Sequence, residues 1–221
     1  MCFYSRQSRE ALTAAKRFRA EVRNPEEFLK SDIINGFSHP SCPVITSEDS
    51  AIIQNYSWGL IPDWSSDISV SDYTLNARIE SLNVTRSFKE YVNNRCLVIA
   101  DGFYEWRHTF INGKKFRERF LITLPGDDLF AFAGLFSHWK DPASGLVKNT
   151  FTIVTTAAND LMSRIHNTKK RMPVILKEED EKEWLTGSDY TRFAFPYSVK
   201  LIATPLPELK EKRGDNTNLL F

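Results

Sequence analysis

The residue with the clearest chemical potential is Cys2, at the start of the chain. Its side chain is small, the kind usually compatible with removal of the initiator methionine, so we expect Cys2 to carry a free α-amine beside its thiol. The ordinary pKa values of these groups are roughly 8 and roughly 8.5, so a minor fraction of each is nucleophilic at neutral pH. An amine converts an aldehyde into an imine, and a neighbouring thiol can then close a five-membered thiazolidine ring. Position alone, however, favours an incidental terminal cysteine.

Two further segments carry groups suited to binding and proton transfer. Asn76, Arg78 and Glu80 occupy alternate positions, so on an extended segment all three project to one side. Glu105 lies within the aromatic sequence Asp101-Gly-Phe-Tyr-Glu-Trp, where desolvation would raise its pKa and suit it to proton transfer near pH 7. A solvated strand face explains the first pattern equally well, and a paired glutamate in a core strand explains the second.

A histidine and a basic loop follow late in the chain. His166 begins the sequence His-Asn-Thr-Lys-Lys-Arg-Met-Pro, which contains Lys169, Lys170 and Arg171. A histidine among cations could polarise an oxygen or bind phosphate, although a charged loop is usually only solvated.

Two tryptophans surround an apolar turn between Trp58 and Trp64. Such a pair could stack on unpaired bases. Core packing is the alternative, and it is the more convincing one for Trp58.

The elements that must position these residues indicate an α+β fold. Strand-like segments dominate the middle of the chain (96–100, 102–107, 115–124, 129–136 and 150–156), with a hairpin signal at Asn112-Gly113. Helical patterns occur around residues 12–22, 87–94, 158–165 and 178–185. Because these do not alternate in a βαβ rhythm, we predict a mainly antiparallel sheet that could close into a barrel, with flanking helices.

Length and composition bound the function classes. The 221 residues, 42% apolar, predict a single domain over residues 1–207 with a flexible tail at 208–221. The net charge of +1 gives no global nucleic-acid signature, so any basic groove must be local. Cys2, Cys42 and Cys96 are odd in number and widely spaced, which argues against a disulfide scaffold, a bound metal or another cofactor. With no apolar run near the roughly 18 residues of a membrane span, we expect a cytoplasmic monomer.

Taken in order, these motifs resemble the SRAP (SOS response-associated peptidase) family. The resemblance rests on Cys2, the Trp58-Gly-Leu-Ile-Pro stretch, Asn76-Ala-Arg-Ile-Glu, Gly-Phe-Tyr-Glu105-Trp and the late His166 with Arg-Met-Pro, and it runs from residue 2 to about residue 203. Eukaryotic members of that family shield abasic sites at replication forks.

The resemblance implies that Cys2 forms a thiazolidine crosslink with abasic sites in single-stranded DNA after Met1 is removed. Asn76, Glu105 and His166 match the family's other active-site positions: Glu105 would shuttle protons, His166 would assist at the sugar oxygen, and Asn76 would orient the terminus or the sugar. Arg78 and the basic loop of Lys169, Lys170 and Arg171 would hold flanking phosphates.

The sequence departs from the family in two places. The family usually begins Cys-Gly-Arg or Cys-x-x-Arg, whereas Phe3 and Tyr4 follow Cys2 here. The common His-x-Arg-Met-Pro is lengthened, with four residues between His166 and Arg171. These departures leave open which basic residues contact phosphates near the terminus and after His166.

Three other activities remain open. A cysteine peptidase or self-processing hydrolase could use Cys2 as nucleophile with His166 or Glu105 as base, and could act first to release Met1. An imine at an abasic site would also permit strand cleavage by β-elimination, a lyase activity. A non-covalent single-strand binder would need only Trp58, Trp64 and the basic loop.

Overall fold

The computed structural model describes residues 2–187 and 189–207, so the tail predicted at 208–221 and the fate of Met1 lie outside the described residues. The strands are β1 Tyr4–Gln7, β2 Glu21–Val22, β3 Ser31–Asn35, β4 Ser41–Thr46, β5 Ile52–Trp58, β6 Asn76–Arg78, β7 Arg95–Ala100, β8 Gly102–Ile111, β9 Lys114–Thr123, β10 Phe130–Lys140, β11 Val147–Ala157, β12 Arg171–Pro173 and β13 Ile202–Pro205. The helices are α1 Ala11–Phe18, α2 Asp160–Ile165 and α3 Glu181–Leu185. Single 3-10 turns are η1 Pro25–Glu27, η2 Gly36–Ser38, η3 Ile68–Tyr73, η4 Ile79–Ser81, η5 Lys89–Tyr91, η6 Glu178–Asp180 and η7 Tyr190–Phe193.

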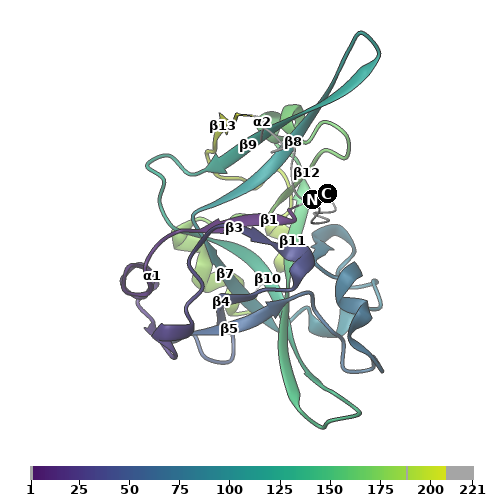
Figure 1. The fold of residues 1–221 in the computed structure, drawn as a ribbon. Helices are drawn as coiled ribbons and strands as arrows, with labels where there is room; N and C mark the ends of the chain where they lie inside the picture. Colours follow the sequence, from purple (N-terminus) through teal and green to yellow (C-terminus); the bar gives the residue numbers. More distant parts are fainter. Residues whose placement is uncertain (1, 188, 208–221) are drawn as a thin grey trace, which may run out of the picture.

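Five strands close into a barrel in the order β11-β10-β7-β4-β5. Four of the pairings are antiparallel, and a parallel contact between β5 and β11 completes the circle. A second sheet, β13-β9-β8-β1-β3, packs beside it and carries the N-terminal strand in its interior (Figure 1). The predicted α+β fold with a mainly antiparallel, barrel-like sheet is therefore confirmed.

The central barrel strand β7 shows why the sequence folds this way. All six of its residues are buried, as its uninterrupted apolar run predicts for a strand covered on both faces. Cys96 and Val98 pack toward a core that includes Phe103 of the second sheet, while the alternate residues of the strand face a separate core under α1 and α3. The second sheet is thus anchored to the barrel by shared apolar burial.

The helices are shorter than their patterns predict. α2 begins at its cap Asn159, whose side chain accepts a hydrogen bond from the Met162 amide at 2.9 Å. The helix expected at 87–94 is wrong: only the turn η5 forms there, because Tyr91 and Arg95 are both buried and tie the segment down on two sides. Among the described helices, none is long and apolar enough to span a membrane.

Candidate active site

Cys2 lies at the entrance of β1 and is fully buried. β1 runs between β3 and β8, and its pairing of Ser5 with Phe103 brings Cys2 beside the strand that carries Glu105. Burial first, and the charge of Glu105 second, raise the pKa of the Cys2 thiol far above its usual range. The expectation that a minor fraction of this thiol is nucleophilic at neutral pH is therefore wrong: the raised pKa keeps it protonated, and it requires a base when it reacts.

Asn76 holds the main chain of Cys2 from the other side. It begins β6, which pairs in parallel with β11 at Ile153. Its Nδ2 donates to the carbonyl oxygen of Cys2 at 2.9 Å. Its Oδ1 is buried and has no hydrogen-bond partner among the described residues. An orphaned buried acceptor is costly, so it marks a place where a donor is expected during function.

Glu105 lies on β8 with only 4% of its surface exposed. Burial raises the pKa of its carboxyl, as its aromatic neighbours in the sequence predict. That expectation is confirmed. A carboxyl group with a raised pKa beside the thiol of Cys2 is suited to proton transfer.

His166 caps the end of α2 and is 93% buried, with 7% of its surface exposed. Its Nδ1 lies 2.8 Å from the carbonyl oxygen and 3.2 Å from the amide nitrogen of Arg171, so the main chain of Arg171 holds this ring nitrogen in either tautomer. Burial is the main cause that lowers the pKa of His166 to about 4. The imidazole is thus neutral at pH 7 and serves as an acceptor or base.

Asn167 fastens the segment after His166 to the strand of Glu105. Its Oδ1 accepts from the amide of His108 at 3.1 Å, and its Nδ2 donates to the carbonyl of the same residue at 2.7 Å. The side chain thereby extends the outer edge of β8 as another strand would. We call this pair of hydrogen bonds the Asn167 fork. Because His108 lies three residues after Glu105 on β8, the fork fixes the main chain next to His166 relative to Glu105.

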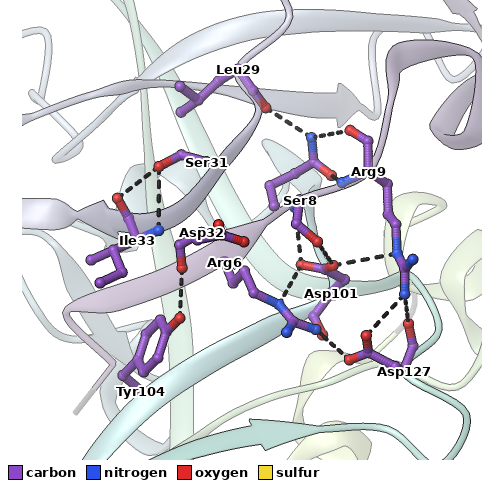
Figure 2. A network of polar contacts seen from close by, with 11 residues as sticks. Arg6, Ser8, Arg9, Leu29, Ser31, Asp32, Ile33, Asp101, Tyr104 and Asp127 are labelled. Atoms are coloured by element: carbon purple, nitrogen blue, oxygen red, sulfur yellow. Dashed lines mark hydrogen bonds and ion pairs between the residues drawn. The ribbon is translucent and has the colours of Figure 1, made fainter.

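A buried carboxylate ties β1 to the start of β8. Asp101 is fully buried and accepts from the amide and hydroxyl of Ser8 and from Nε of Arg6 at 3.1 Å (Figure 2). Arg9 approaches the same carboxylate at 3.4 Å, and both arginines also pair with Asp127. This network of hydrogen bonds and ion pairs fixes the position of β1, the strand that follows Cys2.

The residues predicted to contact DNA fall into different environments. Arg78, Lys169 and Lys170 are exposed. Arg171 instead makes two hydrogen bonds to Glu80, at 2.8 and 2.9 Å, and a third to Thr155. Its guanidinium braces the turn η4 against β11, and this competes with a role as a phosphate contact.

The two tryptophans do not form one platform. Trp58 is 1% exposed and donates from Nε1 to the carbonyl of Leu75, so the prediction that it stacks on bases is corrected to core packing. Trp64 is 43% exposed, but Arg86 covers its ring at 4.2 Å. Ser65, the residue after Trp64, accepts a hydrogen bond through its carbonyl oxygen from Trp139, near the end of β10. Trp64 is therefore remote from Cys2.

An aromatic cluster next to Cys2 was not identified from the sequence. Phe3 stacks on Phe37 with ring centres 4.8 Å apart, and Tyr4 meets Trp106 edge-on at 5.1 Å. Phe37 is 53% exposed. These rings occupy the surface beside Cys2, and nothing local in the sequence links Phe37 to Cys2.

The described residues contain no group of three or more His, Cys, Asp or Glu side chains that could hold a metal ion. All three cysteines are buried and unpaired.

Comparisons with known proteins identify the family of the chain and solved structures with the same fold. The profile of the family described as "SOS response associated peptidase (SRAP)" matches residues 1–206. The abasic site processing protein YoqW of Bacillus subtilis is 40% identical over 184 residues, which are 77% of each chain. The abasic site processing protein HMCES of Pongo abelii is 31% identical over 82% of this chain, which spans 60% of that longer protein. A crystal structure of a Bacteroides thetaiotaomicron protein superposes with a TM-score of 0.85 at 31% identity, covering 94% of this chain and 93% of the other.

Proposed function

Because the chain belongs to the SRAP family, whose relatives above are named for processing abasic sites, we propose that it processes abasic sites in single-stranded DNA by covalent capture on Cys2. The observation that carries the proposal is the placement of Cys2 between Asn76 and Glu105. Both partners approach it from strands distant in the sequence. The reaction requires that hydrolysis of the Met1–Cys2 peptide bond first exposes the α-amine.

Asn76 would orient that amine. Its Nδ2 already binds the Cys2 carbonyl, and its vacant Oδ1 is the acceptor for an N–H of the same residue. Asn167 makes the same fork on His108, so this geometry already occurs within the chain. Held in this way, the lone pair of the amine points toward an incoming aldehyde.

The covalent steps balance without an oxidant or a reductant. The open-chain deoxyribose presents an aldehyde at C1′, and the amine of Cys2 adds to it. Protonated Glu105 gives its proton to the resulting hydroxyl, which leaves as water and produces an iminium ion. The Glu105 carboxylate then takes the proton from the Cys2 thiol as sulfur bonds to the iminium carbon. The products are a thiazolidine, one water molecule and protonated Glu105.

His166 would act at the sugar. A neutral imidazole would accept the hydrogen of the C1′ hydroxyl and pass it to the ring oxygen O4′ as the C1′–O4′ bond breaks and the aldehyde forms. Arg78, Lys169 and Lys170 would contact the flanking phosphates.

The test is a denaturing gel of the protein mixed with uracil-containing single-stranded DNA after uracil excision. The wild-type protein should give a stable adduct without a reductant. The Cys2→Ala variant keeps the amine, so it should give only an imine that survives when borohydride is added. A stable adduct with Cys2→Ala, or none with wild-type protein whose Met1 is removed, would overturn the proposal. Strand cleavage, or equal salt-reversible binding of intact and abasic strands, would favour a lyase or a non-covalent binder.

A further inference from the structure

The hairpin of β8 and β9 extends well beyond the active site. It projects past the body of the protein as the long teal arm (Figure 1). The pairing is continuous from Phe103 opposite Ile122 out to Ile111 opposite Lys114. Asn112 and Gly113 both have positive φ, 51° and 73°, as a two-residue turn that matches strand twist requires. The arm is therefore a regular continuation of the strand that carries Glu105.

One face of this arm combines rings and cations. Side chains alternate between faces along a strand, and directly opposed residues share a face. The opposed pairs on this face, from the active site outward, are Trp106 with Arg119, His108 with Arg117 and Phe110 with Lys115. We call the part beyond Trp106 the ribbon face: His108, Phe110, Lys115, Arg117 and Arg119.

The positive charge of the ribbon face is not neutralised within the described chain. Lys115, Arg117 and Arg119 form no ion pair with a described carboxylate, whereas on the opposite face Arg107 pairs with Glu118. Burial first, and then the charges of Lys115 and Arg117, lower the pKa of His108. Both effects favour the uncharged ring, which lies among cations on this face.

The ribbon face is also exposed and joined to the active site. Phe110 is 71% exposed at its outer end. At its inner end, Trp106 contacts Tyr4, two residues from Cys2. The four residue steps from Trp106 to Phe110 along this face span about 14 Å at about 3.4 Å per residue.

We propose that the ribbon face binds the single strand that flanks the lesion, with phosphates on Lys115, Arg117 and Arg119 and unpaired bases against Phe110 and His108. The inference rests on the proposed function and extends it to a defined footprint on one side of the abasic site. A row of rings on β8 beside a row of cations on β9 suits a single strand, because its bases and its phosphates run side by side along it. An acidic protein partner would meet the same charges but would not require the rings.

The test uses a double variant, Lys115→Gln with Arg117→Gln, and single strands that contain a stable tetrahydrofuran lesion. Loss of two phosphate contacts should reduce the slope of log affinity against log salt by about 1.4, at about 0.7 per contact. The reduction should occur with ten nucleotides on each side of the lesion and be absent with one. Phe110→Ala should weaken binding of the long strand about fivefold or more. The matched control is Lys140→Gln with Lys148→Gln, in the β10–β11 hairpin.

An unchanged slope on the long strand would overturn the inference, as would equal losses on the long and short strands. Phe110→Ala with wild-type affinity would show that charge alone acts there and would overturn the stacking part. Adduct formation on the short abasic strand at saturating concentration should match wild type in the double variant. If wild-type protein itself forms no adduct on that strand, the proposed function fails, whatever the salt slopes show.

Discussion

Replacing Asp101 by Asn should destabilise the protein severely, because that carboxylate is the centre of the network that positions β1. It is fully buried, and it accepts from Arg6 and from two groups of Ser8, with Arg9 nearby (Figure 2). An amide of the same shape removes the charge that compensates Arg6, whose side chain is only 12% exposed. The amide also places its NH₂ group against the groups of Arg6 and Ser8 that donate hydrogen bonds to the carboxylate.

The expected magnitude follows from that burial. Removing one partner of a buried charged pair costs about 3–5 kcal/mol. For a chain of this size, about 2–4 °C of melting temperature is lost per kcal/mol, so the Tm should fall by roughly 6–20 °C. Asp127→Asn is the matched control, since its carboxylate pairs with the same arginines but is 48% exposed. Its loss should cost about 0–1 kcal/mol.

Thermal unfolding followed by circular dichroism measures both variants. Well below its Tm, the folded Asp101→Asn protein should also form the adduct more slowly than Asp127→Asn, because β1 carries Cys2. Equal shifts in Tm for the two variants would refute the argument from burial. A destabilised Asp101→Asn protein with an unchanged adduct rate would show that the network supports the fold without positioning Cys2.

Three further predictions concern the residues around Cys2. Glu105→Gln should slow adduct formation by about 10²–10⁴ in single-turnover assays, the usual contribution of a general acid–base group. Folding raises the pKa of Glu105 above its ordinary value of 4.5, so its contribution to stability is present below pH 4.5 and lost as the pH rises through the folded value. Urea titrations at several pH values should show that Glu105→Gln removes this loss of stability with rising pH. An unchanged pH dependence of stability in the variant would contradict the raised pKa of Glu105. His166 has the opposite sign: its pKa falls from 6.5 to about 4, so its contribution is lost as the pH drops from 6.5 toward 4, and His166→Gln should flatten that window. Asn167→Ala should cost about 0.5–1.5 kcal/mol and speed amide exchange at His108, whereas wild-type exchange would show that the fork is dispensable.

Local patterns in the sequence predicted much of the fold and part of the site. The apolar run of β7, the Asn112-Gly113 turn and the raised pKa of Glu105 each depend on near neighbours, and the structure bears them out. Core packing is the more convincing interpretation of Trp58 from the sequence, and its 1% exposure agrees with that interpretation and not with base stacking.

Long-range contacts account for what the sequence did not reveal. Asp101 meets Arg6 across 95 residues, and Asn76 meets Cys2 across 74. The apposition of Phe37 and Phe3 likewise depends on the pairing of β1 with β3. Barrel closure through the parallel contact of β5 and β11 has no local signal either.

The most direct test of the central claim is a mass spectrum of the adduct formed without reductant, followed by alkylation under denaturing conditions. The adduct should have the combined mass of the abasic strand and the protein lacking Met1, less one water. Cys42 and Cys96 should be alkylated in the adduct while Cys2 is protected, because a thiazolidine consumes both its amine and its thiol. Retention of Met1 in the adduct, or alkylation of Cys2 within it, would contradict the account.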